Sequence, residues 1–306
     1  IYTTYELMRD GAALAPNATI IANGDLPMFS SEKLTNPVEY FGFDHLEDKE
    51  QMADVNTDGV LCPNCDNVLH YKLLTYSNLG KFYCPECDFA RPTLAHKVTD
   101  IKEMTPESSI FSIDGVEFNL PIAGIYNIYN ALAAYSVAKH FGIEEQYIRR
   151  GFAAAERVFG RQEHINIGGK DVVMNLIKNP VGFNQIVDML ATDKTPFSLV
   201  SLLNDRPADG TDVSWIWDGN FEKLVEITTG RPAFLSGIRV ADLSKRFEVA
   251  GLGKNEQITD QDLTHIADWI QKAPTEKIYI LATYTATLDL RRTFAEQGYL
   301  KEGMSI

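Results

Sequence analysis

The sequence predicts an α/β protein in which an irregular N-terminal domain with an inserted zinc ribbon precedes a doubly wound parallel-sheet domain. Two observations lead to this prediction. All four cysteines of the 306-residue chain lie within residues 61–92, and from about Arg161 onward apolar strands alternate regularly with helical patterns. Strands that alternate with helices favour a parallel sheet whose two faces are covered by helices.

The cysteines form two identical C-P-x-C turns, Cys62–Cys65 and Cys84–Cys87, with eighteen residues between them. Two such turns bring four thiolates around one tetrahedral ion, and a closed shell of this kind is a structural zinc site. The segment between the turns alternates as a β-hairpin does. A pair of disulfides would suit a secreted protein, and a redox C-x2-C turn is normally single and begins a helix, so zinc is the preferred interpretation.

Composition limits the function classes. With 45% hydrophobic residues the chain can bury the cores of about two domains, and its net charge of −14 argues against binding nucleic acid through phosphate contacts. It has no apolar run of about 18 residues that could span a membrane, and no signal peptide is recognisable. The first residues, 1–16, predict an amphipathic helix already in progress, so we expect the chain to begin inside a domain.

In the N-terminal half, short strands are predicted at 17–24 and 38–42. The metal-binding segment interrupts this pattern, and strands resume at 110–119, where Asp114-Gly115 is a hairpin signal. A helix is predicted from Ile125 to Phe141.

In the C-terminal half, four strands are predicted, each followed by a helix. The strands are 171–177, 196–205, 232–237 and 277–284, and the helices are roughly 182–190, 221–227, 240–250 and 288–297. Ligands of such sheets bind beyond the carboxyl ends of the strands. The polar segments there are 175–179, 204–212 and 236–239.

Several polar residues could bind a nucleotide. Asn127 and Asn130 share one helix face and could read a purine edge, although two capping amides are an equally ordinary interpretation. Arg161, at the seam between the halves, could clamp a phosphate, or could be a surface residue. Lys178, at the carboxyl end of a strand, could neutralise phosphate charge or be simply exposed.

The loop 202–218 carries four aspartates and two tryptophans. Asp209-Gly210 is typical of a plain turn, and Asp218 could cap the helix that contains Phe221. Asp212 is the candidate for a chemical role. Trp215 and Trp217 are expected to be packing or interface residues.

The order of these segments resembles the Mur ligase family. The stretch G-x-x-N-x-Y-N-A-L-A-A from Gly124, followed by Gly160-Arg161, is similar to the Mur pattern G-x-H-N-x-x-N-x-x-A-A and then G-R. The loops KNPVGFN (178–184), NDRPADGTDVSWIWD (204–218) and SGIRVADLSKR (236–246) look like those of the MurT family, the ligase-like subunits of lipid II isoglutaminyl synthase, which also carry a four-cysteine ribbon.

The resemblance implies a domain division. Residues 1–158 would be the C-terminal part of a Mur ligase middle domain with the ribbon inserted at about 47–92, and residues 159–306 the C-terminal domain. Tyr126 stands where typical Mur ligases have His, and Lys178 stands where their D-Y-A-H-N-P motif has His, both as expected of this family. The sequence contains no G-x4-G-K-[ST] or G-x-G-x-x-G loop. The family's P-loop would precede Ile1, and the fragment is expected to be inactive alone.

The resemblance implies an ATP- and Mg-dependent ligase at the inner, cytoplasmic face of the bacterial membrane. It would amidate the D-glutamate α-carboxyl of the lipid II stem peptide to D-isoglutamine, for peptidoglycan synthesis. Ammonia would come from a GatD-type glutaminase partner, and Asp212 would complete that partner's catalytic triad. A Mur-type ligase that adds an amino acid and a non-enzymatic zinc-ribbon adaptor are the alternatives. Mur-type ligases that add an amino acid generally lack the ribbon, and the acidic charge of the chain argues against the adaptor.

Overall fold

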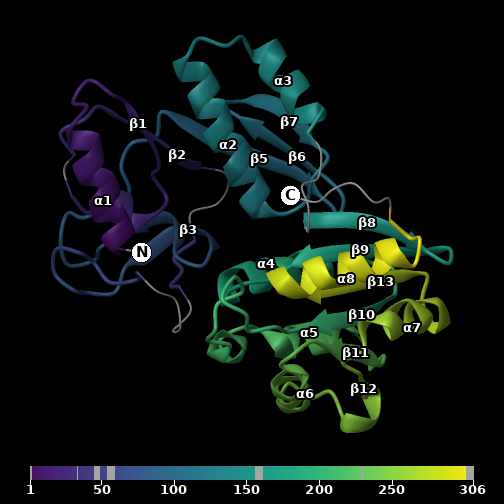
Figure 1. The fold of residues 1–306 in the computed structure, drawn as a ribbon. Coiled ribbons are helices and arrows are strands. Elements are labelled where there is room, and N and C mark those ends of the chain that lie inside the picture. The colour runs from purple at the N-terminus through teal and green to yellow at the C-terminus, as the bar shows by residue number, and fades with distance from the viewer. Residues whose placement is uncertain are drawn as a thin grey trace. The chain divides into compact units, whose positions relative to one another are not determined.

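The computed structural model of the protein describes residues 2–32, 34–44, 49–53, 59–155, 161–228 and 230–300. The chain forms two compact units, Ile1–Ala155 and Glu156–Ile306 (Figure 1). The boundary expected at residues 158 and 159 lies outside the described residues, a few positions from this division.

The first unit is built on a five-stranded sheet of order β1-β2-β5-β6-β7. Its strands are β1 (Ile20–Asn23), β2 (Val38–Phe43), β5 (His96–Met104), β6 (Ser109–Ile113) and β7 (Val116–Leu120). The first three pair in parallel and the last three antiparallel. Asp114 and Gly115 turn β6 into β7 with φ of 50° and 83°, the left-handed conformation that an Asp-Gly hairpin turn requires. The predicted hairpin is confirmed.

Three helices accompany this sheet: α1 (Tyr2–Ala13), α2 (Ile125–His140) and α3 (Glu145–Ala153). The expected helix at the start of the chain is therefore present. Helix α2 contacts β1, β2, β5, β6 and α3, and it buries Ile128 and Leu132 completely against Phe43 and Phe111 of the sheet. A short 3-10 helix, η1 (Pro27–Ser30), follows β1.

The predicted hairpin between the cysteine turns is also present. Strands β3 (His70–Tyr76) and β4 (Leu79–Tyr83) form a separate two-stranded antiparallel sheet with its own small core, in which Leu69, Tyr71 and Phe82 are buried. The expected start of the insert at residue 47 lies outside the described residues.

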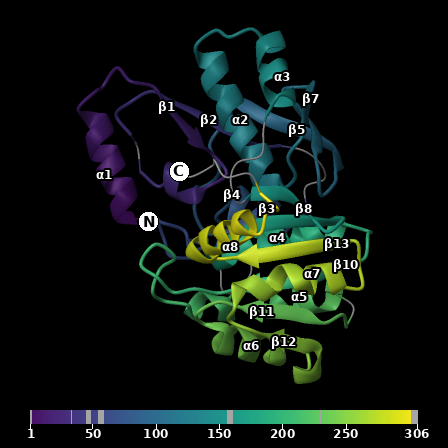
Figure 2. The same cartoon turned by 45° about the vertical axis from the view of Figure 1, so that its right-hand side comes forward.

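The second unit contains a six-stranded sheet of order β12-β11-β10-β13-β9-β8 (Figure 2). Its strands are β8 (Arg161–Ile167), β9 (Lys170–Leu176), β10 (Phe197–Leu202), β11 (Ala233–Ser236), β12 (Gln257–Thr259) and β13 (Lys277–Ala282). The five strands from β12 to β9 pair in parallel. Each of the four strands predicted in this half is present.

Helices cover both faces of this sheet, which confirms the doubly wound prediction. They are α4 (Pro180–Thr192), α5 (Phe221–Thr228), α6 (Val240–Val249), α7 (Ile266–Lys272) and α8 (Tyr284–Glu296), with short 3-10 helices η2 (Ser214–Trp217), η3 (Lys254–Glu256) and η4 (Leu263–His265). Helices α7 and α8 share one hydrophobic core with alternate residues of the strands, whereas α4, α5 and α6 contact one another in series.

Strand β8, strand β12 and helix α7 of this unit were not predicted from the sequence. Strand β8 adds an antiparallel edge to the otherwise parallel sheet, and its hairpin turns at Gly168-Gly169, where φ is 59° and 90°. Strand β12 has only three residues and helix α7 only seven, so neither shows a clear period. Helix α8 also begins at Tyr284, four residues before the predicted start.

Candidate functional site

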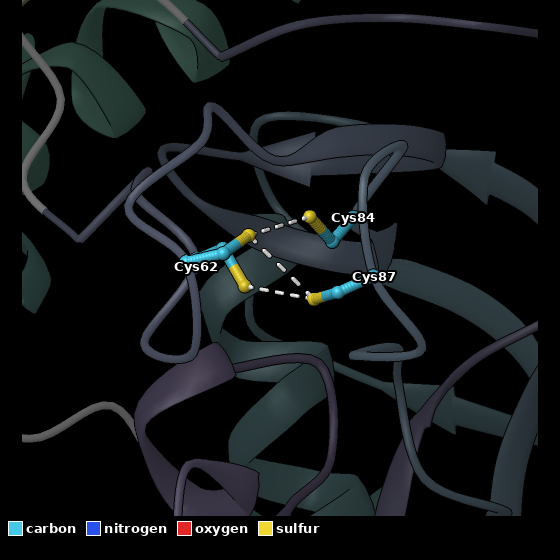
Figure 3. A group of neighbouring side chains, drawn as sticks. Cys62, Cys84 and Cys87 are labelled. Carbon is cyan, nitrogen blue, oxygen red and sulfur yellow. Dashed lines mark hydrogen bonds between the residues drawn. The ribbon is translucent and has the colours of Figure 1, made fainter.

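The four cysteine sulfur atoms lie close together, as their spacing predicted. Figure 3 shows Cys62, Cys84 and Cys87 pointing toward one another. All four Sγ atoms lie within 4.8 Å of one another, and the closest pairs are Cys62–Cys87 and Cys65–Cys84, each at 3.5 Å. A disulfide would place its sulfur atoms about 2 Å apart, so these thiols are not bonded to each other. Four sulfurs in a tetrahedron around zinc, each about 2.3 Å from it, are about 3.8 Å apart. The cluster is therefore compatible with zinc.

Local hydrogen bonds hold the two cysteine turns in place. The backbone N–H of Cys62 donates to the Asn67 carbonyl, and the backbone N–H of Cys84 donates to the Phe89 carbonyl, each at 2.7 Å. The Asn67 side-chain amide donates to Cys65 Sγ at 3.4 Å and, with the Asn67 backbone, lowers the pKa of Cys65 to about 6. A thiolate is the form that binds a metal, so this hydrogen bond favours the ligand state of Cys65, whereas burial raises the pKa of the Cys62 thiol.

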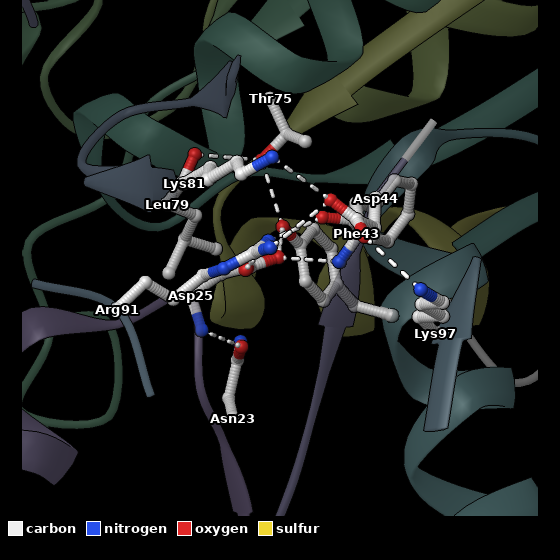
Figure 4. A network of polar contacts seen from close by, with 10 residues as sticks. Asn23, Asp25, Phe43, Asp44, Thr75, Leu79, Lys81, Arg91 and Lys97 are labelled. Atoms are coloured by element: carbon white, nitrogen blue, oxygen red, sulfur yellow. Dashed lines mark hydrogen bonds and ion pairs between the residues drawn. The ribbon is translucent and has the colours of Figure 1, made fainter. Parts of the chain in front are cut away.

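A buried polar network joins the cysteine hairpin to the main sheet (Figure 4). Asp25, which is fully buried after β1, accepts hydrogen bonds from the backbone N–H of Phe43 and the Tyr129 hydroxyl, each at 2.7 Å. Arg91, beyond the second cysteine turn, donates to Asp25 and Asp44, each at 3.1 Å. Burial raises the pKa of Asp25. The sequence reading did not find this network, because its members are up to 104 residues apart and each looks ordinary alone.

The two asparagines proposed as nucleotide ligands lie at the start of α2. Gly124 precedes the helix with φ of 98°. Asn127 is buried, donates its side-chain amide to the Ala123 carbonyl at 2.7 Å, and accepts from Asn130 at 3.3 Å. Both polar atoms of Asn127 are thus engaged within the helix start, although no side chain caps a backbone N–H of α2. Asn130 is exposed, and it is the member of the pair that a ligand could reach.

Arg161 and Lys178 are both placed by strand ends of the second unit. Arg161 begins β8 and lies opposite Asn175 of β9, while its side chain lies outside the described residues. Lys178 is exposed just beyond β9, and the next residue, Asn179, caps α4 by accepting from Gly182 N–H at 2.8 Å. The buried Asn175 side-chain nitrogen has no hydrogen-bond partner in the described structure, which leaves a donor at this strand end for a ligand or water.

Asn204 connects three strand ends at the carboxyl edge of the same sheet. Its side chain donates to Thr285 Oγ1 at 3.0 Å and accepts from the Ile238 N–H at 2.9 Å, and its backbone N–H donates to Thr283 Oγ1 at 2.9 Å. Gly237 permits this closeness, because its φ is 95° and a Cβ there would lie 2.5 Å from the Leu203 carbonyl oxygen. Beside it a cavity of about 360 Å³ is lined by Arg206, Gly237 and Asp289 among others.

The aspartates of the 202–218 loop have separate roles. Asp209 is buried, and its carboxylate accepts from the Thr285 N–H at 2.7 Å, the Thr285 hydroxyl at 2.6 Å and the Arg206 N–H at 3.1 Å. The turn expected at Asp209-Gly210 exists, but the expectation of a plain turn missed this anchoring role. Asp205 pairs with Arg239 at 2.9 Å. Asn220, and not Asp218, caps α5 by accepting from the Lys223 N–H at 3.0 Å.

Asp212 is an exposed carboxylate of this loop, as is Asp218. It accepts from the Ser214 N–H at 2.8 Å, and the backbone and hydroxyl of Ser214 lower the pKa of Asp212. Asp212 is consequently ionised at neutral pH and oriented by its own backbone turn. Trp217 is half exposed and lies against the Arg246 guanidinium, whereas Trp215 packs edge-on against Phe183.

One arginine holds the end of this loop. Arg246 of α6 is buried, donates to the carbonyls of Ile216 and Gly219 at 2.9 Å, and forms a bidentate pair with Glu222 at 2.7 and 2.8 Å. Its guanidinium carbon also lies 4.8 Å from the centre of the Phe221 ring. The segment after Asp212 is therefore fixed to the body of the unit.

The fold and these sites define the class of protein, an α/β protein of the Mur ligase type. A pseudomurein peptide ligase type C from Methanothermus fervidus superposes with a TM-score of 0.64 and 21% identity, over 91% of this chain and 56% of that one. At this identity the likeness concerns the fold.

Proteins that are similar in sequence identify the family to which this chain belongs. The family model described as "MurT ligase C-terminal" matches residues 176–287. The lipid II isoglutaminyl synthase (glutamine-hydrolyzing) subunit MurT of Streptococcus pneumoniae is 41% identical over 310 residues, which cover 100% of this chain and 68% of that protein. The subunit of the same name from Staphylococcus aureus is 32% identical over 76% of this chain and 52% of its own length. The chain belongs to the MurT family of lipid II isoglutaminyl synthase subunits.

Among the helices of the described residues, none combines the length and the apolar composition that crossing a bilayer requires.

Proposed function

We propose that this chain supplies the ligase half of an ATP-dependent amidation of lipid II at the inner face of the bacterial membrane. In this reaction the α-carboxyl of D-glutamate in the stem peptide takes the γ-phosphoryl group of ATP, with release of ADP. Ammonia then attacks the acyl phosphate, phosphate leaves with the C–O electron pair, and a proton is released as the amide of D-isoglutamine forms. Family membership supports this reaction class, since the relatives are named for it.

We propose that the ammonia is made on a separate GatD-type glutaminase subunit. The four cysteines of this chain converge on one cluster, which leaves no cysteine nucleophile for glutamine hydrolysis outside it. A relative's name also describes a glutamine-hydrolysing enzyme with subunits.

The exposed, ionised Asp212 is the observation that carries the partner role. A carboxylate that completes a catalytic triad must be reachable by the partner's histidine, must be charged, and must be held in one orientation. Asp212 meets these requirements, because it is exposed, the pKa of its carboxyl is lowered, and Ser214 fixes it. Asp209 fails the first requirement, since its carboxylate is buried and already accepts hydrogen bonds from Thr285 and Arg206.

The nucleotide contacts belong to the same proposal. We propose Asn130 of the first unit, whose amide donates to Asn127, as a contact to a base. Separately, we propose Arg161 and Lys178 of the second unit as groups that neutralise phosphate charge with Mg²⁺. Zinc held by Cys62, Cys65, Cys84 and Cys87 would have a structural role only, because four protein ligands leave no position for substrate.

The test compares Asp212→Asn with wild-type in the full-length complex with its glutaminase. Asparagine keeps the shape and loses the charge that stabilises an imidazolium, so glutamine-dependent amidation should fall by about 10³-fold or more. Amidation driven by added ammonia should persist, because it bypasses the glutaminase. Asp218→Asn, an equally exposed change in the same loop, is the matched control and should leave both activities near wild-type.

If Asp212→Asn retains normal glutamine hydrolysis in the complex, the triad role is wrong. Equal loss of the glutamine-driven and ammonia-driven reactions would instead indicate that Asp212 only shapes its loop or the interface.

A further inference from the structure

The hairpin β3–β4 takes part in two hydrophobic cores of the first unit. At its cysteine end, Tyr71 and Phe82 are buried in the small core beside the cysteines. At its tip, Tyr76 and Leu79 pack in the core of the main sheet. Two short strands join these ends, and close-packed interiors transmit strain, so a disturbance of the metal site is carried to the tip.

The tip of the hairpin is held firmly against the main sheet. The Gly80 N–H donates to the Asp25 carbonyl oxygen at 3.0 Å, which joins the two backbones. A Cβ on Gly80 would lie 1.9 Å from the Leu73 carbonyl oxygen, so only glycine fits here. The Thr75 hydroxyl donates to the Leu79 carbonyl at 2.9 Å across the turn. The tip therefore presents Thr75 in a fixed position.

Tyr129 is the residue of α2 that receives this tip. Its hydroxyl donates to Asp25 at 2.7 Å and lies 2.8 Å from Thr75 Oγ1, at hydrogen-bond distance. Its ring centre lies 4.2 Å from that of Phe43, and Tyr76 meets it edge-on at 5.8 Å. Burial raises the pKa of Tyr129, so the hydroxyl keeps its proton. Figure 4 shows Asp25, Phe43 and Thr75 in this network.

Tyr129 lies close to the start of α2, where the helix has no side-chain cap. Gly124 is the N-cap residue, and it provides no side chain for the first backbone N–H groups. The first four N–H groups of a helix have no partner within it, so an uncapped start frays easily. The same helix start carries Asn127, which accepts a hydrogen bond from Asn130 at 3.3 Å. The position of this asparagine pair therefore depends on the Tyr129 anchor.

The hydroxyl of Tyr129 is distinct from its packing, since a phenylalanine ring would make the same ring contacts. Its two partners come from different segments, Asp25 from the loop after β1 and Thr75 from the hairpin. A buried hydroxyl that loses a partner is destabilising, and hydrogen bonds in a connected chain strengthen one another. Undocking of the hairpin would thus weaken the hold on α2.

We propose that Tyr129 is a positioning residue that couples the zinc-held ribbon to the start of α2. Loss of the metal would loosen the hairpin, withdraw Thr75 from Tyr129, and release the helix end that carries Asn127 and Asn130. That this helix end meets a nucleotide base rests on the function proposed above. The coupling itself concerns the first unit alone.

Hydrogen exchange of residues 127–133 is the primary measurement, on the zinc-loaded chain and after treatment with a zinc chelator. In wild-type, removal of zinc should raise exchange in this segment by about five-fold or more, the factor that corresponds to about 1 kcal/mol for one hydrogen bond. Tyr129→Phe should raise exchange by a similar factor with zinc bound, because the same contact is lost. Removal of zinc from this variant should then add little.

Tyr135→Phe is the matched control. Tyr135 lies in the same helix, and its hydroxyl also hydrogen-bonds to a carboxylate, that of Asp114. Its ring packs edge-on against His96 and Phe118, on strands of the main sheet and not on the hairpin. Exchange in 127–133 of this variant should respond to zinc as it does in wild-type.

Thr75→Val removes the partner on the ribbon side and leaves α2 unchanged, so it tests the same link if Tyr129→Phe loosens the whole unit. Each single change should raise exchange in 127–133. The double variant should show no more than the larger single effect, because both changes break one contact. Full additivity would show that the two hydroxyls act independently and would overturn the proposal.

The consequence for the reaction is measured in the full-length complex, with ammonia in place of glutamine. Tyr129→Phe should raise the KM for ATP by about five-fold and leave kcat near wild-type, because it loosens a binding contact and not a reacting group. Tyr135→Phe should change neither constant. A fall in kcat at unchanged KM, with exchange raised throughout the first unit, would show loss of folded protein and would contradict the positioning role.

The exchange and kinetic results separate this proposal from the function proposed above. Exchange in 127–133 that ignores zinc in the wild-type chain, or that responds to zinc equally in Tyr129→Phe, overturns the coupling. Zinc-dependent exchange through Tyr129 with an unchanged KM for ATP supports the coupling and contradicts the base contact proposed for Asn130.

Discussion

At the scale of single residues, the 202–218 loop shows why composition cannot assign roles. Asp209 and Asp212 are three positions apart in the same polar loop, yet one carboxylate is buried and the other is exposed. The difference comes from Thr285, 76 residues away, whose N–H and hydroxyl both donate to Asp209. No local pattern encodes that partner.

This difference leads to a prediction about stability. Asp209→Ala should lower the free energy of unfolding of the second unit by about 2–4 kcal/mol, because it removes charge-assisted hydrogen bonds and leaves the Thr285 donors unsatisfied. Urea unfolding, followed by the fluorescence of Trp215, Trp217 and Trp269, which all lie in the second unit, measures this loss. Asp218→Ala is the control and should change stability by less than about 0.5 kcal/mol. Equal stabilities of the two variants would show that the Asp209 contacts contribute nothing.

At the scale of elements, the hairpin β3–β4 has little core of its own. The ribbon buries six residues in its cluster, two of them cysteines. Such a small core seldom folds without a staple, and the metal would provide it.

We therefore expect freshly purified protein to contain one zinc ion per chain, by elemental analysis. Cys84→Ser should lower that content and loosen the ribbon while the second unit stays folded. Hydrogen exchange should accordingly rise in 61–92 and remain unchanged in β9, β10 and β13. Well under one zinc in the wild-type protein, or exchange that rises equally in both units, would contradict this prediction.

Helix α6 provides an element-scale prediction with a pH dependence. Arg246 hydrogen-bonds to Glu222 and thereby lowers the pKa of that carboxyl. A group whose folded pKa is lowered contributes stability above its unfolded pKa of about 4.3, and that contribution is lost as the pH falls through the lower folded value. Glu222→Gln should therefore lower the free energy of unfolding by about 1 kcal/mol at neutral pH and should not change it in strong acid. The expected loss is small because the Glu222 side chain is 57% exposed to solvent.

Denaturant unfolding at several pH values measures this difference. Glu226→Gln removes an exposed carboxylate one turn further along α5 and is the control, which should stay within about 0.5 kcal/mol of wild-type throughout. A cost for Glu222→Gln that does not change with pH would show that packing, and not charge, is lost.

Most elements could be predicted from the sequence, because their signals are local. The four strands predicted in the second unit are mostly apolar and buried on both faces, and Asp114-Gly115 has the turn chemistry of its hairpin. Strand β8 was missed although Ile165 and Ile167 alternate with polar residues and Gly168-Gly169, just before β9, is itself a local hairpin signal. The cysteine cluster was predictable because metal ligation fixes residue type and spacing together. The Asp25–Arg91–Asp44 network was not, since it depends on tertiary contacts alone.

At the scale of the whole molecule, the 306 residues contain candidate contacts for a nucleotide but no G-x4-G-K-[ST] loop. Side chains such as Asn130 and Lys178 can add specificity and charge. The main energy of nucleotide binding in P-loop proteins comes from backbone N–H groups that surround the phosphates.

We therefore expect ATP with Mg²⁺ to bind this chain only weakly. Titration calorimetry should show a dissociation constant of about 1 mM or weaker, which corresponds to at most about 4 kcal/mol of binding free energy. Asn130→Ala and Lys178→Ala should have little further effect, because without a phosphate cradle neither residue has a fixed ligand to contact. Micromolar binding by the wild-type chain that Lys178→Ala abolishes would show that a complete phosphate site lies within these residues.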